Sequence, residues 1–106
     1  MMANPALTEA VYYILLSLMT PRHGYGIMQN VEELSAGRVR LAAGTLYGAL
    51  NTLQEKGWIR TLPGAEDSRK KEYELLPPGR EALAAEIERL RELLRSAENM
   101  MGGDMV

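Results

Sequence analysis

The stretch that decides the fold of this chain runs Gly44-Thr45-Leu46-Tyr47-Gly48-Ala49-Leu50-Asn51-Thr52-Leu53-Gln54-Glu55-Lys56-Gly57. Its leucines recur at positions i, i+4 and i+7, the spacing of one helical face, so they predict a helix whose apolar side lies in a core. Its other side carries mostly hydroxyl and amide groups and a single charge: Thr45, Tyr47, Gly48, Asn51, Thr52 and Lys56. A sparse polar face of this kind can lie against base edges and phosphates in a DNA groove, whereas an ordinary solvated face is rich in Glu and Lys. The stretch therefore predicts a recognition helix that ends at Gly57.

A hairpin is expected directly after this helix. Trp58–Leu62 and Glu72–Leu75 have the composition of strands, and Pro63-Gly64 between them is a turn signal. The basic cluster Arg69-Lys70-Lys71 then falls on an exposed loop of the hairpin. Such a cluster is usually a solubilising charge run, but its position one hairpin away from the recognition helix favours a wing that contacts DNA phosphates.

Two helices are expected before the recognition helix. Their inward stripes are Leu7, Val11, Ile14 and Leu18 in the first, and Ile27, Val31 and Leu34 in the second. Thr8 is the expected N-cap of the first helix, and His23-Gly24-Tyr25-Gly26 opens the second. The only histidine, His23, has no partner at metal-ligand spacing, which favours a surface or capping role. The alternation in Arg38–Leu41 fits a short strand that leads into the recognition helix.

The last helix is predicted to be much longer than the others. Pro77-Pro78 pre-set its start, and the apolar positions of an unbroken heptad seam follow: Leu83, Ile87, Leu90, Leu94, Ala97 and Met101. A helix from Pro78 to Met101 spans roughly 36 Å at about 1.5 Å per residue. That length exceeds what a small core covers, so the seam favours packing against a second copy over folding back along its own domain. The expected fold class is mainly α with a small β-hairpin: a winged helix-turn-helix over residues 1–76, then a C-terminal dimerisation helix and frayed tail over 77–106.

Composition excludes several classes of function. The chain has no cysteine and one histidine, so no nucleophile–base set or metal site is visible, and we expect neither an enzyme nor a bound cofactor. The N-terminal residues lack the basic region of a secretory signal, and the apolar run Ala10–Met19 is too short to cross a bilayer. We therefore expect a cytoplasmic protein with no membrane contact.

The charge distribution is uneven although the net charge is −2. Residues 38–80 hold eight basic residues against five acidic ones, whereas the segments on both sides are acidic. Positive charge is thus concentrated around the proposed recognition helix and wing, where phosphates would need it. Taken alone, a chance imbalance on a solvated surface explains the pattern equally well.

Several of these pieces, in this order and spacing, resemble the PadR family of bacterial transcriptional regulators. The matching pieces are Ile14–Leu18, His23–Ile27, Gly44–Tyr47, Ala49-Leu50, Leu53, Lys56–Ile59, Arg69–Leu75 and Gly79-Arg80. The likeness covers about residues 7 to 83, and one helix after the wing is similar to the short subgroup of the family. It implies a DNA-binding homodimer, usually a repressor, often relieved by a small molecule. By the same likeness Thr45, Tyr47 and Asn51 fall where the recognition helix meets DNA, and Lys70 and Lys71 fall on the wing.

The sequence departs from the family pattern at four points. Gly48 stands where Pro is usual, Thr52 replaces a common basic residue, and Leu76 replaces the Thr that caps the last helix. The last helix also lacks the aromatic residue that some members use to stack on flat ligands. Ligand sensing would then move to Tyr12, Tyr13 and the aliphatic seam.

The resulting hypothesis is a homodimer that binds an inverted-repeat operator in double-stranded DNA, with a hydrophobic small-molecule effector at the dimer interface. The expected DNA-binding residues are Thr45, Tyr47, Asn51, Thr52, Arg69, Lys70 and Lys71. The expected dimer-interface residues are Leu83, Ile87, Leu90, Leu94, Ala97 and Met101 with Leu7 and Val11 of the first helix. The alternative is a winged-helix module that binds a protein or a ligand and has no DNA target, which the net charge of −2 and the loss of a base at Thr52 favour.

Overall fold

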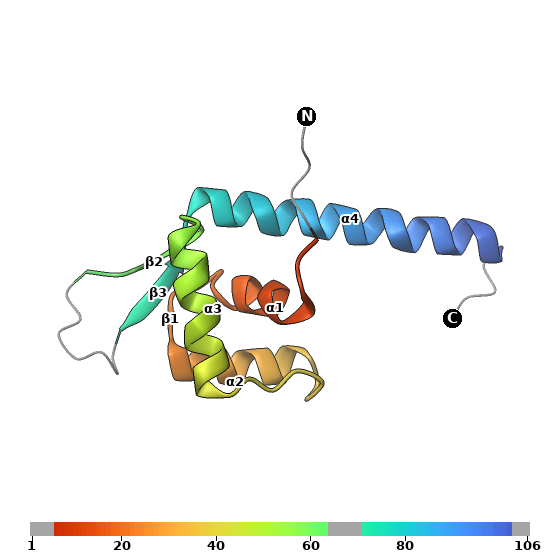
Figure 1. Ribbon diagram of the computed structural model, residues 1–106. Coiled ribbons are helices and arrows are strands. Elements are labelled where there is room, and N and C mark those ends of the chain that lie inside the picture. Colours follow the sequence, from red (N-terminus) through yellow and green to blue (C-terminus); the bar gives the residue numbers. More distant parts are fainter. Residues whose placement is uncertain (1–5, 64–70, 103–106) are drawn as a thin grey trace.

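The computed structural model describes residues 6–63 and 71–102. Within these ranges the chain forms helices around one small sheet, and its longest helix runs along one side of the molecule (Figure 1). The elements in order are α1 (Glu9–Ser17), β1 (Arg22–His23), α2 (Gly24–Leu34), α3 (Ala43–Glu55), β2 (Ile59–Thr61), β3 (Glu72–Leu75) and α4 (Pro77–Met101). This arrangement confirms a mainly helical winged helix-turn-helix followed by one long helix.

One core joins the elements, and most of it comes from the predicted stripes. Its buried residues are Ile14, Leu15, Leu18, Ile27, Val31, Leu46, Leu50, Leu53, Ile59, Tyr73 and Leu83. Helix α1 lies in the middle, packed on one side against α2 and on the other against α4 (Figure 1). Leu34, predicted to point inward, is 45% exposed, because the core that covers Ile27 and Val31 does not reach the last turn of α2.

The helix ends follow local rules. Thr8 caps α1, since its hydroxyl accepts a hydrogen bond from the Val11 amide at 3.1 Å. Helix α2 is stopped by two residues with positive φ, Ala36 at 54° and Gly37 at 82°. Leu76 precedes α4 without a side-chain cap, as its replacement of Thr predicts, and Pro77 begins the helix.

The sheet has three antiparallel strands in the order β1-β3-β2. The strand predicted at Arg38–Leu41 is wrong: this segment is a loop, and the third strand is Arg22–His23, which pairs with Tyr73 and Glu72. The loop satisfies its polar groups by other means, since the Val39 amide donates to the Ser35 hydroxyl at 2.9 Å. A strand of two residues is too short to leave a period in the sequence.

Helix α4 is covered by its own chain only near its start. Leu83 is buried and Ile87 is partly buried, but Leu90, Leu94 and Met101 are 40%, 50% and 51% exposed. The C-terminal half of the helix extends beyond the other elements (Figure 1). The long apolar seam therefore continues onto a surface that the chain itself leaves open. Neither α4 nor any other helix of the described ranges is long and apolar enough to cross a membrane.

Candidate nucleic-acid interface

Helix α3 presents its polar face to solvent. Leu46, Leu50 and Leu53 fix its orientation, because they are 0%, 0% and 3% exposed in the core. The residues on the opposite side are exposed, as predicted: Thr45, Tyr47, Gly48, Asn51 and Thr52. A Cβ added at Gly44 or Gly48 would meet nothing within 4 Å, so these glycines leave the backbone open to a close approach by another molecule. The face is thus free of bulky groups except Tyr47.

Tyr47 packs back onto the start of α2. A Cβ added at Gly24 would lie 2.3 Å from the Tyr47 hydroxyl and 2.8 Å from Cζ, so only glycine leaves room for this ring. Tyr47 is still 42% exposed, which leaves one side of the ring on the α3 surface. The His-Gly-Tyr-Gly and Gly-Thr-Leu-Tyr pieces of the sequence are therefore two halves of one contact between α2 and α3.

Tyr73 of the sheet belongs to the buried core. Tyr73 of β3 is 6% exposed, and burial raises the pKa of its phenol, with a smaller contribution from Tyr47. The packing of Tyr47 against Gly24 thus links α3 to α2. The polar face of the helix predicts Tyr47 on the DNA surface but gives no sign of this packing role, because its partner Gly24 is distant in sequence.

The wing is only partly described. Arg60 of β2 and Glu74 of β3 face each other across the hairpin, with Nε donating to Oε2 at 2.5 Å. Lys71, just before β3, is half-buried. Arg69 and Lys70, which were predicted to contact DNA, lie outside the described residues.

Much of the positive charge in the middle of the chain is compensated. Arg38 pairs with Glu9, Arg40 with Glu32 at 3.7 Å, and Arg60 with Glu74. These pairs are exposed and individually weak, but they reduce the charge left for phosphates. The positive electrostatic field at α3 is therefore weaker than the uneven distribution of charges along the sequence suggests.

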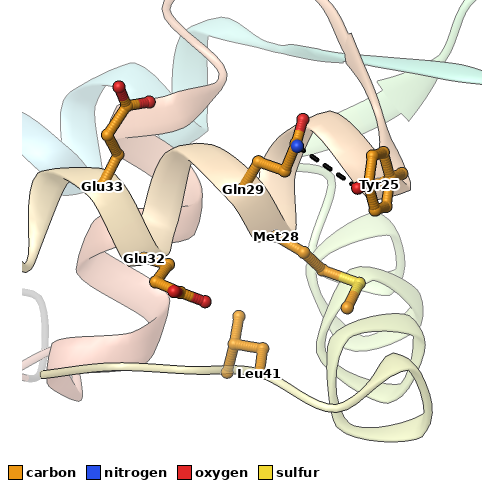
Figure 2. A pocket seen from close by; sticks show the side chains of 6 residues that line it. All are labelled: Tyr25, Met28, Gln29, Glu32, Glu33 and Leu41. Atoms are coloured by element: carbon orange, nitrogen blue, oxygen red, sulfur yellow. Dashed lines mark hydrogen bonds between the residues drawn. The ribbon is translucent and has the colours of Figure 1, made fainter. Parts of the chain in front are cut away.

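The outer side of α2 is unsuited to phosphates. An open cavity of about 560 Å³ lies there. Figure 2 shows the side chains that line it: Tyr25, Met28, Gln29, Glu32, Glu33 and Leu41. Within it Gln29 donates to the Tyr25 hydroxyl at 3.2 Å. None of the lining residues is basic, and Glu32 is paired with Arg40, so this cavity offers no cation to a phosphate.

Helix α1 is fastened to α4 by a buried carboxylate. Glu86 of α4 is 5% exposed, and its Oε1 accepts the Leu7 amide at 3.2 Å and Arg89 Nε at 2.9 Å, while its Oε2 accepts Arg89 Nη2 at 2.6 Å. The Arg89 hydrogen bonds lower the pKa of Glu86, burial opposes this shift, and the Leu7 amide adds to the lowering. Glu86 lies outside the apolar seam, so the heptad pattern predicts it on a solvated face; this is wrong, because the pattern gives no sign that a neighbouring segment supplies a donor.

The described residues contain no arrangement typical of catalysis or metal binding. His23 is exposed and lies 3.8 Å from Glu72, and no group of three His, Cys, Asp or Glu residues in these ranges could hold a metal ion. Leu7 and Val11, predicted for the dimer interface, are partly buried against the core near the start of α1.

Comparison with known proteins agrees with this architecture. The sequence matches the Transcriptional regulator PadR-like family over residues 13–85. It is 40% identical over 73 residues to an uncharacterised 37.1 kDa protein in a Streptomyces fradiae transposon, a match that covers 69% of this chain and 20% of that protein. The chain thus corresponds to about a fifth of this relative's length.

Solved structures share the fold. A PadR family transcription regulator from hypervirulent Clostridium difficile is 24% identical with a TM-score of 0.70, and the match covers 91% of this chain and 100% of that one. Bordetella bronchiseptica BpsR, whose DNA binding is regulated by 6-hydroxynicotinic acid, is 16% identical with a TM-score of 0.69, covering 92% of this chain and 69% of that one. Two observations lead to one conclusion: the family match covers most of the chain, and α3 turns a small polar face outward beside the wing. This chain belongs to the PadR-like family of DNA-binding transcriptional regulators.

Proposed function

We propose that the chain represses transcription as a homodimer that binds an inverted-repeat operator. The observation that carries the proposal is the coexistence of two surfaces: the small polar face of α3 and the apolar seam of α4 that the chain itself does not cover. A two-fold axis through α4 would present two α3 helices to one duplex. For half-sites that lie one turn of DNA apart, the two helices would be separated by about 34–36 Å. Repression is the usual mode of the family that the sequence resembles.

The dimer is supported by the exposed part of the seam. Leu90, Leu94 and Met101 lie at heptad spacing on the overhanging half of α4, and Leu93 beside them is 53% exposed. Large apolar side chains gathered on one helix mark an interaction surface rather than ordinary scatter. Val11 of α1 and Leu7, which lies just before α1, would add to the contact between copies.

We assign recognition of the DNA bases to the centre of α3. Asn51 is exposed on the open face, and its amide can donate and accept at once, as recognition of adenine in the major groove requires. The exposed side of Tyr47 lies about one turn before Asn51, Thr45 lies between one and two turns before it, and Thr52 is the next residue. Lys71, with Arg69 and Lys70 of the wing, supplies phosphate contacts that fix orientation but carry no sequence information.

An effector at the dimer interface would relieve repression by shifting the population between two arrangements of the long helices. The fold supports this mode, because BpsR shares it and has DNA binding that a small molecule regulates. The interface offers hydrophobic surface from both α1 and α4.

The proposal is tested with duplexes selected from a random pool and fluorescence anisotropy at several salt concentrations. Asn51→Ala should cost roughly 1–3 kcal/mol on the selected site and relax its specificity. Lys71→Ala should weaken binding to all duplexes and reduce the salt slope by about 1. If both variants bind DNA with normal affinity, specificity and salt slope, α3 and the wing are not part of the interface with DNA.

A second candidate is a winged-helix module that binds a protein or ligand and no DNA. The ion pairs of Arg38, Arg40 and Arg60 favour it, because they reduce the positive surface near α3. A stable dimer without salt-dependent affinity for any duplex would support this candidate against the first.

A further inference from the structure

The open cavity on the outer side of α2 belongs to neither of the surfaces assigned so far. Its volume is about 560 Å³. Its lining residues come from α2 and from the loop that follows it, so none of them belongs to the polar face of α3 or to the seam of α4 (Figure 2). An occupant of this cavity would therefore contact residues that the proposed DNA and dimer contacts do not use.

The apolar part of the cavity is anchored to the core. Met28 of α2 and Leu41 of the loop are partly buried and pack against the core cluster. Tyr25 is 69% exposed, and its hydroxyl accepts a hydrogen bond from Gln29 at 3.2 Å, which holds the ring along the helix. Tyr and Met are enriched at protein interfaces, and the flexible Met side chain adapts its shape to a partner. The cavity thus offers an ordered apolar surface to a side chain of another protein.

The charge of the cavity is negative. Its two charged residues are Glu32 and Glu33, and none of its lining residues is basic. Glu32 lies on the same side of α2 as Met28 and Leu41, whereas Glu33 points to the other side (Figure 2). The pair of Glu32 with Arg40 is long, at 3.7 Å, and both side chains are more than half exposed, so the pair is weak and the carboxylate can exchange partners. In the residues that the structure describes, no basic side chain forms an ion pair with Glu33. Both carboxylates can thus accept a cationic side chain.

The shape of the cavity favours a stretch of polypeptide over other occupants. A small molecule usually buries roughly 70–90% of its surface in its site, which a cavity open along one side does not provide. From Tyr25 to Glu33 the lining runs along about 12 Å of helix, the length of about four residues of extended chain. The lining offers no cation to a phosphate, which excludes a nucleic acid or an anionic lipid surface.

We propose that the outer face of α2 docks a short extended segment of another protein, which carries an apolar side chain and, two residues away, an arginine or lysine. The apolar side chain lies against Met28 and Leu41, and the cation pairs with Glu32. Glu32 follows Met28 by about 6 Å along the helix, which matches the separation of about 6.6 Å between alternate residues of an extended segment. Glu33 adds negative charge for a second basic residue. The inference does not rest on the proposed function, because it uses none of the DNA or dimer contacts.

The test begins with a library of random eight-residue peptides, displayed on phage and selected on the immobilised full chain. The recovered peptides should share a basic residue and an apolar residue two positions apart. The peptide recovered most often is synthesised, and its affinity for the chain is measured by isothermal titration calorimetry. Its dissociation constant should rise with salt concentration, because salt screens partly exposed ion pairs.

Paired variants test the charge of the cavity. Glu32→Gln combined with Glu33→Gln keeps the size of both side chains and removes their charge. This double variant should bind the peptide roughly tenfold more weakly, the range of two partly exposed ion pairs. Glu81→Gln combined with Glu88→Gln makes the same change of charge at exposed positions of α4 and should leave the affinity unchanged.

Two further variants test the apolar part. Leu41→Ser removes apolar surface from the cavity and should weaken peptide binding roughly tenfold. Tyr25→Ala should also weaken it, and because Tyr25 is mostly exposed this variant leaves the core intact. Thermal unfolding followed by circular dichroism checks that each variant is folded.

The proposal is wrong if no peptide is enriched, if the enriched peptides lack basic residues, or if the double variant of Glu32 and Glu33 binds as tightly as the wild-type chain. It is also wrong if peptide affinity falls as the concentration of the chain rises, because a second copy would then cover this face. DNA binding is measured separately. A chain that binds the peptide but no duplex keeps the docking face and loses the proposed function; a chain that binds duplexes but no peptide does the reverse.

Discussion

At the scale of single residues, the contact between Gly24 and Tyr47 explains why two glycine- and tyrosine-containing motifs occur together. Gly24 lies at the first position of α2, where alanine would suit the helix better. The ring of Tyr47 occupies the space that a Cβ would need. The glycine is therefore required by a neighbour and not by its own backbone.

Gly24→Ala should consequently destabilise the protein by about 1–3 kcal/mol, the usual range for overpacking. In a Tyr47→Ala background the same substitution should cost little, because the ring that it would meet is gone. Urea denaturation of the four proteins of this cycle measures the coupling. Additive effects would show that the two residues do not constrain each other.

Two further glycines make a matched pair. A Cβ at Gly79 would lie 2.3 Å from the backbone oxygen of Trp58, whereas a Cβ at Gly48 would meet nothing within 4 Å. Gly79→Ala should cost about 2 kcal/mol or more, because a backbone atom cannot swing aside. Gly48→Ala should instead stabilise α3 by about 1 kcal/mol through helix propensity. Denaturant midpoints test both, and a neutral Gly79→Ala would contradict the close approach of α4 to the hairpin.

The burial of a residue could be predicted from the sequence where the residue belongs to a helical repeat of apolar positions. Leu46, Leu50 and Leu53 are buried as their spacing predicts. Tyr47 and Glu86 could not be placed in this way, since their partners Gly24 and Leu7 lie far away in the sequence. The candidate DNA residues were found as a polar helix face, but whether they contact DNA is still a prediction.

At the scale of elements, the joint between α1 and α4 depends on Glu86. Its carboxylate holds the segment that enters α1 and orders Arg89 on α4. The helices could be predicted from the sequence, because the periodic spacing of their apolar residues is a local pattern. The short strand β1 could not, because it forms through pairing with β3 and not through a local pattern.

This joint should weaken in acid. The pKa of Glu86 in the folded protein lies below its unfolded value of about 4.5, so its contribution to stability is full above that pH and is lost as the pH falls through the folded value. Glu86→Gln should therefore cost about 1–2 kcal/mol at neutral pH and show a flatter loss of stability in acid. Glu88→Gln is the matched control, because Glu88 is exposed and pairs with Arg91 one turn away. Identical pH profiles for the two variants would argue against a special role for Glu86.

At the scale of the whole molecule, the overhang of α4 is the basis of the proposed dimer. The molecule extends 56 Å along its longest axis, and α4 supplies much of that length (Figure 1). The sequence predicted the length of this helix correctly, because a heptad seam is a local pattern. The same pattern does not say what covers the seam, and a second copy of the chain is the proposed answer.

Leu94→Glu should convert the dimer to a monomer, since it places a charge in the middle of the exposed seam. Ser96→Glu adds the same charge on an exposed side of α4 and should leave the dimer intact. Sedimentation velocity over a range of concentrations distinguishes the two. A wild-type chain that stays monomeric would remove the basis for paired reading helices.

The most direct test of the account measures how affinity depends on the spacing of the two halves of a selected inverted repeat. Two α3 helices fixed by one α4 dimer must meet the same side of the duplex, so inserting about five base pairs, half a helical turn, should abolish high-affinity binding. The complex should also contain two chains per duplex. Affinity that is unchanged by the insertion, or one chain bound per duplex, would contradict the account.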